Sequence, residues 1–138
     1  MLITRRAEFS ASHVCRNPHF SDEENYRIYG PAANPHGHGH NYLVEITIEG
    51  RPDAQTGMVR DLKEVKNILN AEVIDPFDHR FLNHEVAPFD RVIPTAENIA
   101  VEIWRRLEPK FKSAQSRLHS VRLQETPDLS VEYRGEAE

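Results

Sequence analysis

Three histidines stand within five residues in the stretch from Asn34 to Tyr42. From His38 onward the chain alternates as far as Ile48, which is the period of a half-buried strand. Because this period is two, His38 and His40 leave the strand on the same face, which is also its apolar face. A His-x-His pair at the start of a strand offers two imidazole nitrogens to one metal ion.

A third imidazole comes from the first strand of the chain. Residues 2–14 alternate as well, and His13 lies near the end of this strand on its mostly apolar face. Three neutral histidines with one open position describe a catalytic zinc site, whereas a structural site has a fourth protein ligand, usually cysteine. We therefore predict that His13, His38 and His40 bind zinc. His36 shares their parity but lies earlier, and we expect it to be a neighbour rather than a ligand.

The alternative for these residues is a purely structural role. Histidines are often partly buried and hydrogen-bonded to the backbone, and for His13 alone this is the more frequent case. A metal site has the advantage that it explains all three histidines at once. A third interpretation takes residues 36–40 as a metal-buffering segment, but such tracts are usually disordered and do not lead into a strand.

A carboxylate falls on the apolar side of a closing strand. In the alternating run Val121, Leu123, Glu125 the glutamate occupies a position where an unpaired carboxylate is costly, so it needs a partner with donor groups. One interpretation is an arginine of the protein itself. The other is a ligand with two adjacent N–H groups, such as the edge of a pterin or a guanine, because a carboxylate accepts both in a bidentate pair.

Asp78 and His79 form a third candidate. A histidine oriented by a carboxylate is a standard arrangement for general acid–base catalysis. Sequence neighbours do not always meet in space, however, and a capped turn after Pro76 explains the pair equally simply. The pair therefore gains weight only from the other features of the sequence.

Composition places the chain among ordinary globular proteins. Its 138 residues are 38% hydrophobic and 28% charged, which predicts a single domain over residues 1–138. The net charge of −5 and the lack of a basic run argue against a nucleic-acid partner. The single cysteine, Cys15, excludes an internal disulfide. No apolar run reaches membrane-spanning length and no signal-peptide core follows the first residues, so we expect a cytoplasmic protein without a membrane partner.

The elements that must position these residues follow from periodicity and capping. Two strands are followed by two helices and two closing strands, with predicted boundaries at 2–14, 38–50, 61–75, 95–107, 119–126 and 129–134. Asp61 and Thr95 are the predicted helix caps, Asp75-Pro76 the stop of the first helix, and Met58-Val59 a hairpin partner for the second strand. Residues 16–34 read as a long functional loop with a helical turn at 21–24.

The order of these strands and helices predicts an α+β fold, with a mainly antiparallel four-stranded sheet and both helices on one face. Its two open edges favour association.

Seven segments of the sequence, in the same order, resemble the 6-pyruvoyltetrahydropterin synthase and 6-carboxytetrahydropterin synthase family. They are Phe9-Ser10-Ala11-Ser12-His13, Ser21-Asp22-Glu23-Glu24-Asn25, Asn34-Pro35-His36-Gly37-His38-Gly39-His40-Asn41-Tyr42, Thr56-Gly57-Met58, Phe77-Asp78-His79, Pro94-Thr95-Ala96-Glu97-Asn98 and Gln124-Glu125-Thr126. The resemblance covers essentially the whole chain.

The resemblance implies the tunnelling fold, in which three subunits close a twelve-stranded barrel and two rings stack as a homohexamer with sites between subunits. It also implies 7,8-dihydroneopterin triphosphate as the substrate. The implied site residues are His13, His38 and His40 for zinc, Glu125 for the pterin, Asp78 and His79 for proton transfer, and Thr95 and Glu97 near the pterin.

The sequence departs from the family at one important place. The family's catalytic cysteine stands a few residues before the His-x-His pair, where this chain has Ala32, or Asn34 with the shorter spacing of the 6-carboxy branch. Neither side chain can act as a general base, and the branch that uses glutamate here is not matched either. Cys15 shares strand parity with His13 but not the family's position, and its simplest interpretation is a small buried residue.

The resemblance therefore implies a zinc-dependent lyase that makes 6-pyruvoyltetrahydropterin with loss of triphosphate, as in tetrahydrobiopterin biosynthesis. His36, Cys15 or a zinc-bound hydroxide would then take over from the missing cysteine. One alternative is a 6-carboxytetrahydropterin synthase, which releases acetaldehyde and feeds the synthesis of queuosine. Two others are side-chain cleavage toward a folate precursor, and a pterin-binding or impaired homologue.

Overall fold

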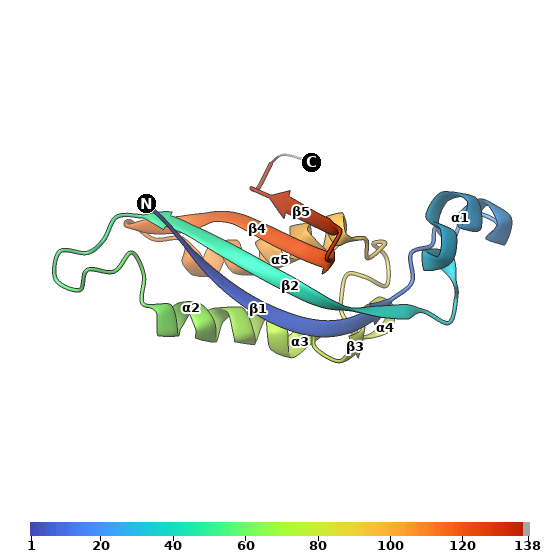
Figure 1. Ribbon diagram of the computed structural model, residues 1–138, viewed down its shortest axis with the longest axis horizontal. Helices are drawn as coiled ribbons and strands as arrows, with labels where there is room; N and C mark the ends of the chain where they lie inside the picture. Colours follow the sequence, from blue (N-terminus) through green and yellow to red (C-terminus); the bar gives the residue numbers. More distant parts are fainter. Residues whose placement is uncertain (137–138) are drawn as a thin grey trace.

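A five-stranded sheet runs through the computed structural model, which describes residues 1–136 (Figure 1). The strands are β1 (Leu2–His13), β2 (His38–Gly50), β3 (Arg80–Phe81), β4 (Ser116–Thr126) and β5 (Leu129–Tyr133). Their order across the sheet is β3-β1-β2-β4-β5. All neighbours are antiparallel except β3, which lies parallel to the end of β1.

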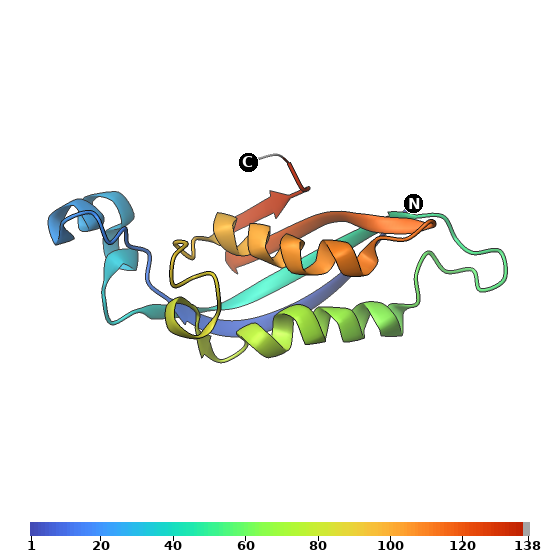
Figure 2. The same cartoon turned by 180° about the vertical axis from the view of Figure 1, so that it is seen from behind.

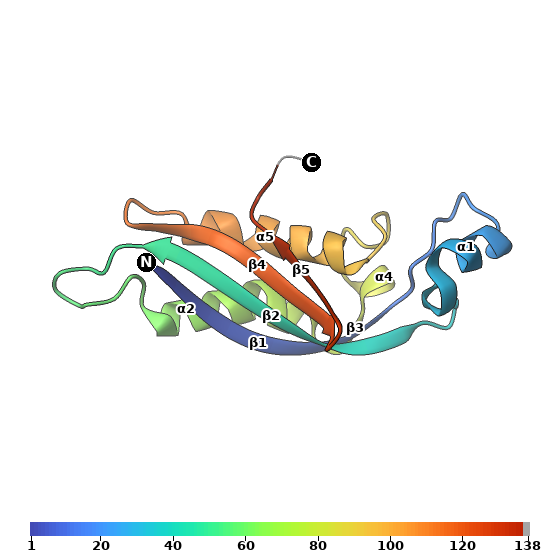
Figure 3. The ribbon, with the colours of Figure 1, turned by 45° about the horizontal axis from the view of Figure 1, so that its top comes forward.

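Helical segments connect the strands. They are α1 (Asp22–Tyr29), the 3₁₀ turn η1 (Gly30–Ala33), α2 (Leu62–Leu69), the π-helical turn η2 (Asn70–Ile74), α3 (Asp75–Phe77), α4 (Leu82–Glu85) and α5 (Ala96–Phe111). The helical path from α2 to α3 and helix α5 lie on one face of the sheet (Figure 2). Within residues 1–136, no helix covers the other face (Figure 3), while α1 forms an arm beyond the end of the sheet at which β1 ends and β2 begins.

The core lies between the sheet and the helices because the strands alternate. Val44, Ile46 and Ile48 of β2 are fully buried, while the residues between them are partly exposed. Nearer the histidines, the ring of Phe9 stacks on that of Tyr42 with centroids 4.9 Å apart. These rings lie on the face from which the histidine side chains also leave the sheet.

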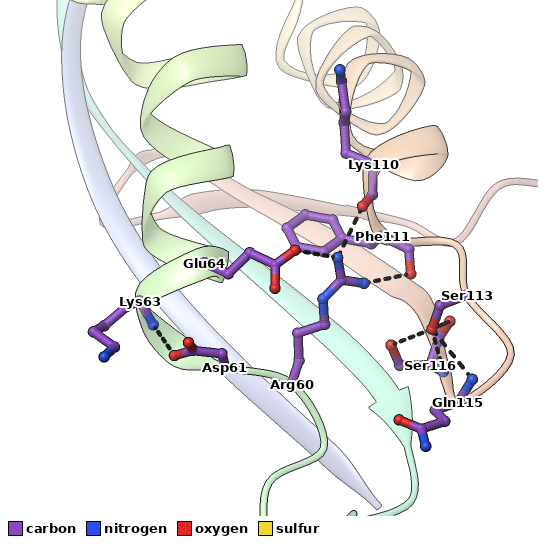
Figure 4. Close-up of polar contacts among 9 residues, drawn as sticks. All are labelled: Arg60, Asp61, Lys63, Glu64, Lys110, Phe111, Ser113, Gln115 and Ser116. Carbon is purple, nitrogen blue, oxygen red and sulfur yellow. Dashed lines mark hydrogen bonds and ion pairs between the residues drawn. The ribbon is translucent and has the colours of Figure 1, made fainter.

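Capping residues fix where the long helices begin, as predicted. The side chain of Asp61 accepts a hydrogen bond from the N–H of Lys63 at the start of α2, and that of Thr95 accepts one from Asn98 at the start of α5. Arg60 connects the start of α2 to the end of α5. Its guanidinium donates to the carbonyls of Lys110 and Phe111 and pairs with Glu64 (Figure 4).

The sheet differs from the predicted one in three respects. It gains a fifth, two-residue strand, β3, beside β1. The predicted hairpin partner at Met58-Val59 is wrong, because the carbonyl of Met58 accepts from the N–H of Asp53 and closes a loop instead of extending the ladder. Strand β4 also begins three residues earlier than predicted, at Ser116.

The predicted helix stop at Asp75-Pro76 is wrong as well. Helical structure continues to Phe77, because the π-helical turn η2 widens the helix just before the proline. A proline ring would otherwise clash with the preceding turn. The helix ends at Asp78, whose backbone is extended, so that the next residues reach the edge of β1.

The loop after β1 is more ordered than its composition suggests. Ser21 caps α1 as predicted, by accepting from the N–H of Glu24. The buried side chain of Asn25 accepts from the N–H of Asn17 and donates to its carbonyl. These bonds make the arm a folded unit. No helix within residues 1–136 is both long and apolar enough to span a membrane.

Candidate metal centre and active site

The register of β1 and β2 brings three histidines together. His13 pairs with His38, and Ala11 with His40, so the three imidazoles leave adjacent strands on the helix-covered face. One nitrogen of each lies within 4.8 Å of the others. The Nε2 atoms of His13 and His38 are 3.0 Å apart, close to the separation of about 3.3 Å that two nitrogens have when both bind one tetrahedral zinc ion.

The other nitrogen of His13 fixes its tautomer. Nδ1 lies 2.7 Å from the carbonyl oxygen of Pro94, and because a carbonyl only accepts, Nδ1 carries the proton and donates it. The lone pair of Nε2 is then free for a metal. Burial lowers the pKa of His13 to about 4, helped by His38 and His40 and opposed by the bond to Pro94. The ring is therefore neutral at pH 7, as a metal ligand must be.

One nitrogen on each of the other two histidines lacks a hydrogen bond. Nδ1 of His38 and Nε2 of His40 are buried and make no hydrogen bond within residues 1–136. Burial lowers the pKa of both side chains, and for His38 the neighbouring His40 adds to this. A buried polar atom without a partner is costly, and a metal ion at the convergence point would remove part of that cost. The residues present therefore fit a metal ion.

Glu125 lies beside this centre. Its carboxylate oxygen is 3.5 Å from Nε2 of His40, and its side chain is 15% exposed. The pairing of β4 with β5 is irregular here, since Gln124 pairs with Ser130 and Thr126 with Leu129 while Glu125 is skipped. Such bulges re-aim a side chain. Burial raises the pKa of Glu125, Glu97 raises it further, and His38 opposes the change.

Asp78 and His79 do meet, at the edge of the sheet. Nδ1 of His79 is 2.9 Å from one oxygen of Asp78, and the other oxygen accepts from the backbone N–H of Ser10. The bond from Ser10, followed by that from His79, lowers the pKa of Asp78. His79 adopts a left-handed conformation (φ 60°) with its side chain 82% exposed, which is uncommon outside functional sites and turns. It borders the same hollow, of about 560 Å³, as His40.

The segment before α5 touches the centre through its backbone. Thr95 uses its hydroxyl to cap the helix, and Glu97 is exposed in the first turn. The link to the three-histidine group is instead the carbonyl of Pro94. Sequence patterns did not predict this contact, because it joins residues 81 positions apart through a backbone atom.

Cys15 lies behind the three-histidine group. Its sulfur is 3.9 Å from Nδ1 of His13 and 3.9 Å from the carbonyl of Pro94, so it contacts the side of the ring opposite to the free Nε2. Burial raises the pKa of the thiol to about 11, with Glu125 and Glu97 adding to the shift. Its backbone N–H donates to the carbonyl of Ala32. The two positions are thus neighbours, but the thiol faces away from the side on which a metal would bind.

Two further residues, Asn83 and Tyr42, contact the part of the chain that carries His13. Asn83 forms a pair of hydrogen bonds with the backbone of Val14, as a neighbouring strand would. The hydroxyl of Tyr42, fully buried, is 3.4 Å from Nδ1 of His13, and burial raises the pKa of this phenol. His36 is exposed and lies outside the converging group, which consists of His13, His38 and His40.

Comparison with known proteins gives a consistent result. The family model described as "6-pyruvoyl tetrahydropterin synthase" matches residues 2–136. The human protein named 6-pyruvoyl tetrahydrobiopterin synthase is 40% identical over 134 residues, 97% of this chain and 91% of its own length. A protein of Rickettsia bellii named 6-carboxy-5,6,7,8-tetrahydropterin synthase is 32% identical, over 94% of this chain and 96% of its own.

The fold agrees with these sequences. A solved structure of 6-pyruvoyl tetrahydropterin synthase from Caenorhabditis elegans superposes with a TM-score of 0.92 at 33% identity, and covers 99% of this chain and 96% of the other. Fold and site together define an α+β protein of the tunnelling fold with a three-histidine centre. The chain belongs to the 6-pyruvoyl tetrahydropterin synthase family.

Proposed function

We propose that this chain is a zinc-dependent lyase that converts 7,8-dihydroneopterin triphosphate to 6-pyruvoyltetrahydropterin with release of triphosphate. The observation that carries the proposal is the meeting of three neutral imidazoles with a partly buried carboxylate, Glu125, 3.5 Å from His40. The three imidazoles form the metal centre, and the carboxylate of Glu125 accepts hydrogen bonds from the edge of the pterin. Relatives of about 40% identity bear the name of this enzyme.

The side chains at the site have different roles in the proposed reaction. The carboxylate of Glu125 accepts hydrogen bonds from the ring N–H and the 2-amino group of the pterin. This pair of bonds fixes the direction in which the side chain of the pterin points. His13, His38 and His40 hold the metal. Zinc, when bound, supplies Lewis-acid polarisation of the side-chain hydroxyls and lowers their pKa.

Proton transfer needs a group other than the family's cysteine. We assign this role to His79, with Asp78 holding its Nδ1–H, because the pair is formed and its imidazole is exposed. The thiol of Cys15 is a poor candidate, since it lies on the far side of the His13 ring and its pKa is about 11. With Ala32 at the cysteine's place, we expect a slower enzyme rather than an inactive one, because one acid–base group typically contributes about 10²–10⁴-fold.

We further propose that the chain acts as a hexamer of two stacked rings. The uncovered face of the sheet is polar, with Arg122 and Arg6 on either side of Glu45. The outer edge of β5 has no strand partner among residues 1–136, and β3 covers the outer edge of β1 only at Ala11 and Ser12. Such edges favour pairing with other chains, and a ring would place the exposed His79 of one subunit beside a neighbour. The predicted mass is six times the 15.9 kDa of one chain. A cytoplasmic location remains a prediction.

The experiment is product analysis by mass spectrometry after the zinc-loaded protein has been incubated with 7,8-dihydroneopterin triphosphate. A 6-pyruvoyl product is expected. A 6-carboxy product would support the second candidate, a synthase of the queuosine pathway, which the similarity to the Rickettsia protein favours. Unchanged substrate, with one zinc per chain verified, would contradict both and leave a pterin-binding homologue.

A further inference from the structure

The segment Ile93–Asn98 is closed on itself by hydrogen bonds. Asn98 donates from its side-chain nitrogen to the carbonyl of Ile93 at 2.9 Å and from its backbone N–H to the hydroxyl of Thr95 at 3.2 Å. The N–H of Thr95 donates to the same carbonyl of Ile93 at 2.8 Å. These bonds hold the backbone on both sides of Pro94, whose ring also restricts φ.

The carbonyl of Pro94 links this segment to the three histidines by a hydrogen bond. It accepts the Nδ1 proton of His13 at 2.7 Å, and both residues are buried. Outer-shell acceptors of this kind fix the orientation and tautomer of a metal-binding histidine. Because Asn98 fixes the Pro94 peptide, it acts on the orientation of His13 without touching the ring.

We infer that Asn98 is a positioning residue of the metal centre, acting through the Pro94 carbonyl on His13, so that metal binding and the order of the α5 cap are coupled. The inference rests on the metal site of the proposed function but needs no pterin chemistry. Coupling of this kind is reciprocal. The cap that orients His13 must itself become more rigid when His13 binds metal.

The chain offers a matched control at its other long helix. Asp61 caps α2 with the same kind of bond, from the N–H of Lys63 at 2.9 Å, and the N–H of Val65 donates to its carbonyl at 3.0 Å. Helix α2 begins near the end of β1 opposite to the histidines (Figure 1). Loss of this cap lowers stability by the usual amount, but has no path to the metal centre.

The first measurement is zinc affinity by chelator competition for wild type, Asn98→Ala and Asp61→Ala. Loss of an outer-shell partner typically weakens metal binding 10- to 100-fold, and we expect about tenfold for Asn98→Ala and no change for Asp61→Ala. The visible spectrum of the cobalt-substituted protein should change for Asn98→Ala alone. Equal zinc affinity in all three proteins would overturn the inference, and so would equal weakening in both variants.

The second measurement uses the wild-type chain, and so holds even if Asn98→Ala does not fold. Zinc should slow hydrogen exchange at the N–H groups of Asn98 and Ile99, which bond to Thr95, more than at those of Lys63 and Val65. Equal slowing at both caps, or none, would contradict the coupling, as would a wild-type chain that binds no zinc. Failure of the proposed lyase reaction would appear separately, as zinc binding and coupling without product.

Discussion

His13 and His38 face each other across the paired strands β1 and β2 with their Nε2 atoms 3.0 Å apart. The tautomer of His13 leaves its Nε2 without a proton, so the pair is ready to share one cation. His38→Ala should therefore abolish zinc binding at one ion per chain, measured by elemental analysis after gel filtration. His36→Ala is the control and should retain the zinc. Retention of stoichiometric zinc by His38→Ala would refute the ligand assignment.

Glu125→Gln should separate pterin binding from metal binding. A hydrogen bond to a charged group contributes about 1.5–3 kcal/mol, so loss of the charge should weaken binding of a pterin probe such as neopterin about 10- to 100-fold in fluorescence titrations. The zinc content should stay the same. Glu8→Gln, an exposed glutamate of β1, should behave as wild type. Unchanged neopterin affinity for Glu125→Gln would show that the carboxylate has another role.

His79→Ala should slow turnover without changing zinc content or neopterin affinity. Loss of an acid–base group typically reduces the rate about 10²–10⁴-fold. Asp78→Asn, which keeps the shape but removes the charge beside Nδ1, should show a smaller loss and a shifted pH profile of kcat. His119→Ala, at a histidine of β4, is the control. A variant at position 79 with wild-type kcat would remove the pair from the mechanism.

Two variants test the missing cysteine. Cys15→Ser should leave kcat nearly unchanged, because the sulfur contacts the Nδ1 side of His13. Ala32→Cys should increase kcat, up to the roughly 10²-fold of one added acid–base group. If Cys15→Ser were inactive with its zinc intact, the thiol and not His79 would be the acting group.

The stability of the metal-free protein should depend on pH through the histidines. The pKa of His13 is about 4 in the folded chain against an ordinary 6.5, so between these values the unfolded chain binds a proton that the folded chain does not. The free energy of unfolding therefore rises with pH over this window, by about 3 kcal/mol at most. His38 and His40 act in the same direction, and the raised pKa of Glu125 acts against it.

Thermal unfolding of the metal-free chain from pH 4 to 7 provides the measurement. The midpoint should rise with pH in wild type and rise less in His13→Gln. Identical slopes for the two proteins would mean that His13 is not held neutral by the fold.

Sequence periodicity predicted the part of the site that lies on strands. Because side chains alternate along a strand, parity alone put His13, His38, His40 and Glu125 on buried faces, and the register of β1 and β2 then brought the histidines together. The helix caps at Asp61 and Thr95 could also be predicted, because a capping side chain bonds to backbone only two or three residues further along the chain.

Contacts that depend on three-dimensional packing were beyond such patterns. The Pro94 carbonyl, the Asn83 bonds to Val14 and the strand β3 all join residues distant in sequence through backbone atoms, which leave no trace in residue type. Pro76 misled the prediction because its effect on a helix depends on the hydrogen bonding of the preceding turn, and that turn is π-helical.

The most direct test of the account is the dependence of triphosphate release on metal. The protein is stripped with a chelator, one half is reloaded with zinc, and inorganic triphosphate released from 7,8-dihydroneopterin triphosphate is measured in both. We predict release by the reloaded protein, saturating at one zinc per chain, and none above background by the stripped protein. Equal release with and without zinc would contradict the central claim that His13, His38 and His40 form the catalytic metal centre.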